Sequence, residues 1–405
     1  MPYRLAQIEL THPLPTLEIP ATHTGLAIVL RYRDRPIGFL IRPLDANRQL
    51  TLEQLEQWIA QEMGTKLLQE VIRQELLPPL DLTGFPTLTI AICTKDRPNN
   101  VLRLLQSLLP LQQADRAPRF EILVVDNAPT DDRTQTLIAS LPTVRYIREP
   151  KAGLDFARNR AVQDATGELL AFLDDDVTVD RQWLNGLMSA WAENPDAAAF
   201  TGLVLPYELE TEAQILFEQR GGFRRGFEKI RYGSTQPGNP LYPCGAGIFG
   251  AGCNMAFRRQ VLLELGGFDD ALDTGKPLPG GGDLDIFYRV IRAGYPLVYE
   301  PQYLVYHQHR RELAQLRHQY WTWGLGMMAF VVKSLQQDPP LRFRLVQLIA
   351  WWFKDQLCQL QQSMIRQHVL SPGMISSEFW GGIVGLFGEY PRSLKRVEQI
   401  RRQCS

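Results

Sequence analysis

Residues 169–176 read Leu-Leu-Ala-Phe-Leu-Asp-Asp-Asp, an apolar run that ends in three consecutive carboxylates. An unbroken apolar run of this length predicts a strand buried on both faces. One aspartate could cap the following helix, but Asp180 is better placed for that role. Three adjacent carboxylates repel one another unless a cation or hydrogen-bond donors lie among them. The stretch therefore predicts a buried strand that delivers Asp174, Asp175 and Asp176 to a ligand site.

The residues before this stretch predict strands and helices in alternation. Strands are expected over residues 88–93, 120–125 and 144–147, and helices over residues 99–109, 132–140 and 154–165. Strands alternating with helices at this spacing indicate βαβ units and a mostly parallel sheet. Ligands of such sheets bind beyond the carboxyl ends of the strands. Residues 94–98 and the pair Asp126-Asn127 follow two of the strands, so we expect them on the same edge as the acidic stretch.

The acidic stretch has the chemistry of a divalent metal site. Hard cations such as Mg²⁺ take oxygen ligands and are typically held by one or two carboxylates together with the phosphates of a substrate. A cation held in this way neutralises the charge that develops on a leaving diphosphate. We therefore expect Asp174–Asp176 to bind Mn²⁺ or Mg²⁺ together with a nucleotide diphosphate.

Six short motifs follow one another along the chain. They are TKDRP at 94–98, VVDN at 124–127, Gly153 with ARN at 157–159, FLDDD at 172–176, GGFD at 266–269 and GGDLD at 281–285. Each is weak alone, but together they span about residues 87–311 and resemble the family 2 glycosyltransferases, which have the GT-A fold. The resemblance implies a metal-dependent enzyme that moves a sugar from a nucleotide-diphosphate donor to an acceptor hydroxyl and inverts the anomeric carbon.

The resemblance also implies a role for each matching residue. Donor-binding roles fall to Thr94, Asp96 and Arg97 in the nucleotide pocket, Asp126 on the base, Arg158 and Asn159 near the ribose or diphosphate, and Asp174 and Asp175 on the nucleotide and sugar. Asp176 would be the principal metal ligand. Similar sequences often place a histidine where His307 stands, which makes His307 a candidate metal ligand and His309 a weaker one. The alternative for both histidines is an ordinary solvated surface position.

Asp283 is the predicted general base on the acceptor side. A sugar hydroxyl has a pKa far above neutrality, so it needs a carboxylate within hydrogen-bond reach to take its proton. Asp283 begins a predicted helix whose Ile286, Phe287 and Val290 face inward, and the helix dipole favours a charged carboxylate there. The alternative role is a helix cap. Similar sequences often carry a glutamate directly before this aspartate, but here the residue is Gly282, which leaves acceptor binding open.

Residues 245–250 match the pattern G-x-G-x-x-G. The dinucleotide-binding fingerprint requires a strand directly before this pattern and a helix directly after it. A proline-rich segment precedes it here, and another glycine turn follows. We therefore expect a loop over the acceptor site rather than a dinucleotide site.

The segments on either side of the motifs predict two further domains. Residues 1–80 predict a small α+β module, with strands over 26–31 and 37–42, a capping box at Thr51 and Gln54, and a helix that ends at Pro78-Pro79. Residues 312–405 interleave apolar and aromatic segments with Arg and Lys. None of these segments reaches the ~18 consecutive apolar residues of a spanning helix. These helices either lie on a membrane surface or pack on the catalytic domain.

Charge and cysteine content indicate where the protein works. From residue 301 onward the chain has 13 Lys and Arg against 6 Asp and Glu, a charge of +7, while the first 300 residues have 30 against 38, a charge of −8. A basic tail on an acidic body indicates an anionic partner. Five cysteines without a CxxC pair, and no apolar leader segment, predict a cytoplasmic protein. If the tail binds lipid, the protein lies at the inner face of the plasma membrane.

Together these observations predict an α/β fold, with a GT-A-type, mostly parallel sheet flanked by helices over residues 85–311 and the two flanking domains beside it. The predicted function is cell-surface polysaccharide or glycolipid synthesis, with a nucleotide-sugar donor, a glycan or lipid-linked acceptor and no nucleic-acid partner. Two alternatives stay open. A nucleotidyltransferase also uses Mg²⁺ and carboxylates, but it would normally carry a glycine-rich loop after the first strand, and residues 94–98 contain no glycine. A non-catalytic protein that only binds nucleotide sugars would keep the fold.

Overall fold

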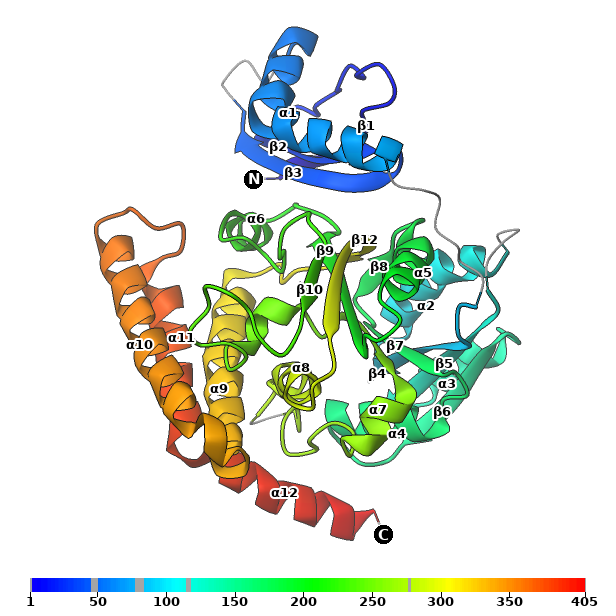
Figure 1. The fold of residues 1–405 in the computed structure, drawn as a ribbon, viewed down its shortest axis with the longest axis vertical. Helices are drawn as coiled ribbons and strands as arrows, with labels where there is room; N and C mark the ends of the chain where they lie inside the picture. The colour runs from blue at the N-terminus through cyan, green and yellow to red at the C-terminus, as the bar shows by residue number, and fades with distance from the viewer. Residues whose placement is uncertain (1, 45–49, 77–83, 114–117, 276–277, 405) are drawn as a thin grey trace.

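The structure is a computed structural model that describes residues 2–44, 50–76, 84–113, 118–275 and 278–404. Within these residues the central sheet has nine strands in the order β10-β12-β9-β11-β7-β4-β5-β6, with β8 beside β12 (Figure 1). The strands are β4 (Leu88–Thr94), β5 (Phe120–Asn127), β6 (Val144–Glu149), β7 (Leu169–Asp174), β8 (Val177–Val179), β9 (Ala199–Pro206), β10 (Ile230–Tyr232), β11 (Asn254–Arg258) and β12 (Leu297–His307).

One half of the sheet is parallel, as predicted. β4 pairs in parallel with β5 and β7, and β5 with β6. The other half is mixed, because β11 runs antiparallel to both β7 and β9, and β12 runs parallel to β9 but antiparallel to β8 and β10. β9 ends at the same edge of the sheet as β7. The connection after β9 returns to this edge, so β11 enters the sheet there and runs antiparallel to both strands. The sheet is thus more mixed than the sequence indicated.

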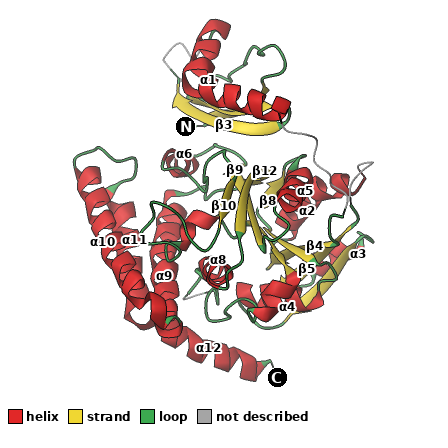
Figure 2. Cartoon of the chain, in the orientation of Figure 1, coloured by secondary structure: helices red, strands yellow, loops and turns green. Residues whose placement is uncertain are grey.

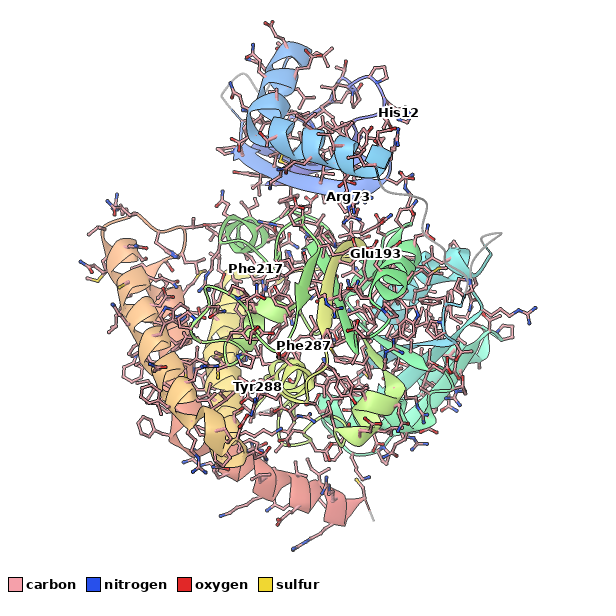
Figure 3. All side chains as sticks on the ribbon, viewed as in Figure 1. His12, Arg73, Glu193, Phe217, Phe287 and Tyr288 are labelled. Carbon is pink, nitrogen blue, oxygen red and sulfur yellow. The ribbon has the colours of Figure 1, made fainter. Side chains whose placement is uncertain are left out.

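Helices cover both faces of the sheet (Figure 2). On one face α2 (Pro98–Leu108), α3 (Arg133–Ala139) and α5 (Trp183–Glu193) bury side chains such as Val101, Ile138 and Leu187. On the other face lie α4 (Leu154–Asp164), α7 (Arg259–Glu264) and α8 (Gly282–Arg292), and Phe287 of α8 lies in this part of the core (Figure 3). Shorter elements are α6 (Glu212–Gln219) and the 3₁₀ helices η1 (Leu109–Gln113) and η2 (Ala246–Phe249).

The N-terminal module consists of β1 (Tyr3–Glu9), β2 (Gly25–Tyr32), β3 (Arg35–Pro43) and α1 (Leu52–Leu76). The predicted strands and the Thr51–Gln54 capping box are present, whereas β1 was not predicted. The predicted helix end at Pro78-Pro79 lies outside the described residues.

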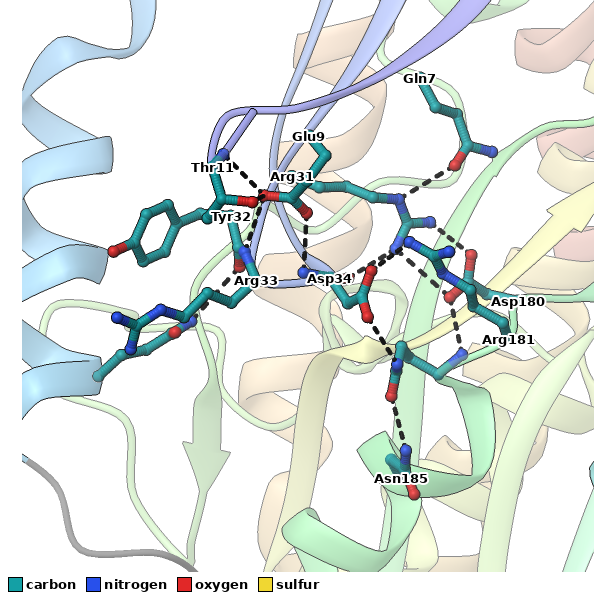
Figure 4. Close-up of polar contacts among 12 residues, drawn as sticks. Gln7, Glu9, Thr11, Arg31, Tyr32, Arg33, Asp34, Asp180, Arg181 and Asn185 are labelled. Carbon is teal, nitrogen blue, oxygen red and sulfur yellow. Dashed lines mark hydrogen bonds and ion pairs between the residues drawn. The ribbon is translucent and has the colours of Figure 1, made fainter. Parts of the chain in front are cut away.

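Buried ion pairs join the module to the catalytic domain, and Figure 4 shows the contact of Arg31 with Asp180. Arg31, only 2% exposed, pairs with Asp180 and donates to the hydroxyl of Tyr306 at 2.8 Å. Nearby, Arg35 lies 3.0 Å from the fully buried Glu300. The prediction that Asp180 caps α5 is wrong, since the N-cap is Gln182. The Asp180 carboxylate accepts from the Gln182 amide at 2.9 Å and serves mainly as the partner of Arg31.

The C-terminal helices pack on the catalytic domain through the first helix and again through the last, whose Tyr390 hydroxyl donates to Asp269. They are α9 (Leu313–Gln337), the 3₁₀ turn η3 (Pro339–Leu341), α10 (Arg342–Met364), α11 (Pro372–Val384), the π turn η4 (Gly385–Glu389) and α12 (Tyr390–Gln403). Phe330 and Val331 of α9 belong to the core of the catalytic domain. α9 and α11 approach so closely that a Cβ atom at Gly324 would lie 2.0 Å from the carbonyl oxygen of Glu378. In the part of the chain that the structure describes, no helix is both long enough and apolar enough to cross a membrane.

Candidate active site

Two adjoining cavities open at the carboxyl ends of β4, β5 and β7. The first, which we name the strand-end cavity, has a volume of about 700 Å³ and is lined by residues that include Thr94, Asp96, Arg97, Asn127, Gly153 and Asp175. The second, the helix-side cavity, has a volume of about 500 Å³ and is lined by residues that include Phe223, Arg225, Asp283, Trp323, Met327 and Trp352. Both cavities share Leu154, Asp174, Asp176, Asp273, Pro279 and Arg310. The acidic stretch therefore lies on the boundary between two ligand-sized spaces.

Asp175 holds the first βα loop in place. Its Oδ2 atom accepts a hydrogen bond from Thr94 Oγ1 at 2.7 Å, and its Oδ1 atom accepts one from Arg97 Nη1 at 3.1 Å. The sequence placed Asp175 on the nucleotide or sugar. The structure adds that two of the predicted donor-binding side chains are oriented by it.

Asp176 has one oxygen among cations and one without a partner. The Oδ2 atom lies 3.9 Å from the guanidinium groups of both Arg97 and Arg310. The Oδ1 atom lies 3.3 Å from Nε2 of His307, yet it is buried and has no hydrogen-bond partner. Pairing of β8 with the end of β12 brings His307 to this place. The structure thus brings together the two predicted metal ligands.

The three aspartates differ in their proton affinity. Burial raises the pKa of Asp174 to about 6, although Arg158 opposes the shift. Burial and the neighbouring Asp176 also raise the pKa of Asp175. For Asp176, burial alone would raise the pKa, but His307, Arg310 and Arg97 outweigh it and lower the pKa well below its ordinary value. Carboxylates crowd this boundary, so a bound cation would stabilise their charged forms.

Arg158 is the buried cation between the two cavities. Its Nη1 atom donates to Asp155 Oδ1 at 2.9 Å and to Asp273 Oδ2 at 3.3 Å, and its Nη2 atom lies 3.9 Å from Asp174. Its side chain is 4% exposed and lines the helix-side cavity. Asp273, which lines both cavities, was not singled out from the sequence, because nothing in its neighbourhood distinguishes it from an ordinary loop aspartate.

Asp283 lines the helix-side cavity from the first turn of α8. Its Oδ2 atom accepts from the Gly252 amide at 3.0 Å, and its Oδ1 atom accepts from the Leu284 amide at 2.8 Å. These bonds hold the carboxylate toward the glycine-rich loop, whose Gly247 and Gly250 also line this cavity. The predicted position of Asp283 across from the acidic stretch agrees with this geometry.

The space beside Gly282 explains why this position carries no side chain. A Cβ atom built on Gly282 would lie 2.2 Å from Oδ2 of Asp155. Asp155 is fully buried and bound to Arg158. A glutamate at position 282 would therefore collide with a carboxylate that already occupies its place.

Two predicted donor-binding residues lie away from the cavity walls. Asp126 is fully buried and accepts from the hydroxyl of Tyr146 at 3.0 Å, while its neighbour Asn127 lines the strand-end cavity. Asn159 donates to the carbonyl oxygen of Phe268 at 2.9 Å and to Asp270 at 2.7 Å. In this structure Asn159 fixes the loop after α7, and its role toward a donor stays a prediction.

Aromatic residues of the helix-side cavity were also missed by sequence reasoning. Phe223 comes from the segment after α6, Trp323 from α9 and Trp352 from α10. The sequence showed these residues only as part of a loop or an apolar helix. Their meeting at one cavity depends on how the C-terminal helices pack.

Comparison with known proteins agrees with this architecture. Residues 89–266 match the family model described as glycosyl transferase family 2. The succinoglycan biosynthesis protein ExoM of Rhizobium meliloti is 29% identical over 235 residues, which cover 56% of this chain and 69% of that protein. The glucosyl-dolichyl phosphate glucuronosyltransferase of Haloferax volcanii is 28% identical over 38% of this chain and 47% of its own. The pre-mycofactocin glycosyltransferase of Mycobacterium tuberculosis is 24% identical over 65% of this chain and 51% of its own, so two of these three relatives are matched over about half their length.

A solved structure supports the fold. The mannosyltransferase PcManGT from Pyrobaculum calidifontis, solved in complex with GDP-Man and Mn²⁺, superposes with a TM-score of 0.52 at 17% identity, over 81% of this chain and 96% of that one. This superposition covers a larger share of the chain than residues 89–266 of the family match. The central domain thus has the GT-A fold, and its residues 89–266 are similar to glycosyltransferase family 2.

Proposed function

We propose that the protein transfers a sugar from a nucleotide-diphosphate donor to an acceptor hydroxyl, with a divalent cation and with inversion of the anomeric carbon. The observation that carries this proposal is the boundary between the two cavities, where Asp174 and Asp176 are shared and Asp283 lies on the acceptor side. The strand-end cavity would hold the nucleotide, and the helix-side cavity the acceptor. The sugar would then lie at the boundary, between leaving group and base.

The donor side has residues that fit a diphosphate and a metal ion. Asp176 offers a buried oxygen without a hydrogen-bond partner, and His307 lies beside it. Among the described residues no three His, Cys, Asp or Glu side chains gather closely enough to hold an ion by themselves. Mg²⁺ and Mn²⁺ sites of this kind are completed by substrate phosphates and water. A bound cation would neutralise the charge of the leaving diphosphate, and Arg97 and Arg310 would add hydrogen bonds to its oxygens.

On the acceptor side the chain supplies a base and a binding surface. Asp283 would accept the proton of the attacking hydroxyl as that oxygen bonds to the anomeric carbon and the diphosphate leaves. Direct displacement from the face opposite the leaving group inverts the configuration. Phe223, Trp323 and Trp352 provide aromatic surface for the acceptor.

The names of the relatives support a place in glycan or glycolipid synthesis. Two of the matched proteins are named for succinoglycan biosynthesis and O-antigen biosynthesis, and a third for glucuronosyl transfer to glucosyl-dolichyl phosphate. We therefore include synthesis of a cell-surface polysaccharide or glycolipid in the proposal, with a glycan or lipid-linked acceptor.

A thermal-shift screen of nucleotide sugars with and without Mn²⁺ tests this function. A donor at ~100 times its Kd stabilises the native state by about 2.7 kcal/mol, which raises Tm by several degrees. We expect one nucleotide class to raise Tm only with Mn²⁺, and the NMR spectrum of the product to show an inverted anomeric carbon. Release of pyrophosphate from a nucleoside triphosphate would instead identify a nucleotidyltransferase, and donor binding without any turnover would identify a binding protein.

We infer that the outer face of the C-terminal helices contacts an anionic membrane surface. Several large apolar side chains of these helices are more than half exposed, among them Phe343 at 76%, Met364 at 70% and Phe387 at 71%. On α10 the exposed residues Phe343, Val346, Leu357 and Met364 are spaced so that they share one side of the helix. The Phe353 and Phe379 rings, 5.3 Å apart, connect α10 to α11.

The charge of this region favours anionic lipid over a second protein copy. From Arg342 to the end, the chain has 9 Lys and Arg against 4 Asp and Glu. Lys354, Arg366, Arg392 and Lys395 are exposed. Two copies that met through this face would bring like charges together, whereas the anionic leaflet attracts each basic residue by about 1 kcal/mol. Aromatic and basic residues together are typical of helices that lie in the membrane interface.

Vesicle flotation tests the membrane surface. With vesicles that contain one-third phosphatidylglycerol we expect binding that is at least tenfold stronger than to pure phosphatidylcholine. The double change Trp380→Ser, at a 59% exposed residue of α11, and Phe387→Ser should abolish most of this binding. Burying one such side chain contributes about 1.5–3 kcal/mol. Leu68→Ser, which removes a 60% exposed leucine from α1, is the matched control and should bind as the unchanged protein does. A dimer in solution that the double change dissociates would contradict the membrane assignment.

A further inference from the structure

A buried chain of polar groups continues from His307 away from the cavities. Nδ1 of His307 lies 3.0 Å from Nδ1 of His309, and Nε2 of His309 lies 2.7 Å from Oε1 of Glu218. The other carboxylate oxygen of Glu218 pairs with the guanidinium of Arg224. His307, His309 and Glu218 are 7%, 3% and 1% exposed. Water therefore has little access to these groups, and they depend on one another for hydrogen bonds.

Rigid elements hold both imidazole rings. Glu218 lies on α6, whose start is fixed by a capping box between Thr211 and Gln214. Phe217 of the same helix (Figure 3) packs 4.6 Å from the ring of His309, and Phe223 packs 5.1 Å from the ring of His307. Neither ring can turn without displacing aromatic neighbours, so the pairing of ring nitrogens is set by the packing.

For neutral imidazole rings, counting donors and acceptors assigns the ring hydrogens. Glu218, paired with Arg224, is an acceptor, so the hydrogen on His309 is at Nε2. A neutral imidazole has only one ring hydrogen, so Nδ1 of His309 is an acceptor and Nδ1 of His307 must be the donor. When His307 is neutral, the form that binds a metal ion, Nε2 is then the nitrogen whose lone pair is available, and it lies 3.3 Å from the Oδ1 atom of Asp176, which has no hydrogen-bond partner. Two acceptors that face each other in a buried place suit a cation between them.

We propose that Glu218 and His309 are positioning residues, which present Nε2 of His307 to the divalent cation of the proposed transferase. This inference rests on the proposed function, because it concerns the metal of the same site. Both ring nitrogens of His309 are engaged, so His309 acts through His307 and is not itself a ligand. Glu218 is separated from the cation by His309 and His307, and it affects the affinity of the site for the cation by orienting these two rings. Such outer partners of ligating histidines typically affect metal affinity by about 10–100-fold.

The test is Mn²⁺ affinity, measured on the full-length protein without donor. The protein is freed of metal with EDTA and titrated with MnCl₂, and free Mn²⁺ is followed by its EPR signal. Glu218→Gln should raise the Kd for Mn²⁺ by about 10–100-fold. His309→Phe keeps an aromatic ring in the same packing but removes the acceptor for His307, and it should have the same effect. Since buried Glu218 could be needed for folding, His309→Phe provides an independent second variant.

Two further measurements separate positioning from a general loss of charge or fold. Pulsed EPR of the bound Mn²⁺ should show coupling to an imidazole ¹⁴N nucleus, which Glu218→Gln and His309→Phe weaken and His307→Gln removes. Glu208→Gln is the matched control, because Glu208 pairs with Arg311 nearby and accepts hydrogen bonds from Gln214 and Gln308 rather than from a histidine ring. This variant should keep the Kd for Mn²⁺ within about threefold of that of the unchanged protein. A change of that size is well below the effect expected when a residue that orients a metal ligand is lost.

The outcomes that overturn the proposal are distinct. If a folded Glu218→Gln or His309→Phe protein binds Mn²⁺ as tightly as the unchanged chain with full ¹⁴N coupling, the positioning role is wrong while the metal site stands. An equal loss in Glu208→Gln would reduce the effect to general electrostatics and reject the positioning role. If the unchanged chain binds no Mn²⁺, the metal part of the proposed function falls, and this inference falls with it.

Discussion

Asp283→Asn is expected to lower the turnover number by about 10²–10⁴-fold, the usual contribution of a general base. The substitution keeps the shape of the side chain and can still accept from the Gly252 amide, which Asp283 binds at 3.0 Å. It removes the one property that the reaction needs, which is affinity for the proton of the acceptor hydroxyl. Donor binding should stay within about threefold, because Asp283 lines the helix-side cavity and not the strand-end cavity.

Turnover with the donor found by the thermal-shift screen measures this effect, and the Tm shift with donor and Mn²⁺ serves as its control. Loss of a carboxylate from the first turn of α8 costs at most about 1 kcal/mol of stability, so the variant should stay folded. Undiminished turnover would reject Asp283 as the base. Loss of donor binding together with turnover would show that Asp283 belongs to the donor site instead.

Asp176→Asn is expected to remove the metal dependence of donor binding and to lower turnover by about a thousandfold or more. A catalytic metal contributes several kcal/mol to the stabilisation of transition-state charge, and each 1.4 kcal/mol is tenfold in rate. The amide would keep the shape of the side chain but lose the negative charge that faces Arg97, Arg310 and His307. Arg97 and Arg310 would then face the nucleotide without the charge of Asp176.

This second prediction is measured as donor affinity with and without Mn²⁺. In the unchanged protein the affinity should rise with Mn²⁺, and in Asp176→Asn the two values should coincide. Asp132→Asn, at a carboxylate whose side chain is 73% exposed and pairs with Arg148, is a suitable control for the loss of one negative charge. Metal dependence that survives in Asp176→Asn would place the cation elsewhere.

The sequence predicted the part of the fold that local pattern determines. Strands β4, β5 and β7 are continuous apolar runs that end in polar residues, so both their existence and their common edge could be read from the chain. The antiparallel partner β11 could not, because its Met255 and Phe257 are as apolar as those of a parallel strand and the direction depends on a long connection. Pairing partners of distant strands are a property of the whole sheet.

In the candidate site, too, some residues are identified by local motifs and others only by the packing of distant elements. Asp174, Asp176 and Asp283 were found from motifs and do line the cavities, and the roles proposed for them remain to be tested. Glu218 and His309 were not connected from the sequence, because their contact joins α6 to the end of β12. Asp155, which occupies the space beside Gly282, carries no local signal either. Side chains that act through a neighbour become visible only when the neighbour is in place.

The buried ion pairs of the N-terminal module have a consequence for dissecting the protein. Asp180 and Glu300 belong to the catalytic domain, but Arg31 and Arg35, which pair with them, come from the module. A fragment that begins at residue 85 would contain the whole family 2 region, yet it would leave the 6% exposed Asp180 without its guanidinium and Glu300 with Lys229 alone. Breaking a buried pair by removing one partner is commonly destabilising by about 3–5 kcal/mol. We therefore expect a fragment that begins at residue 85 to be less stable than one that begins upstream of Arg31.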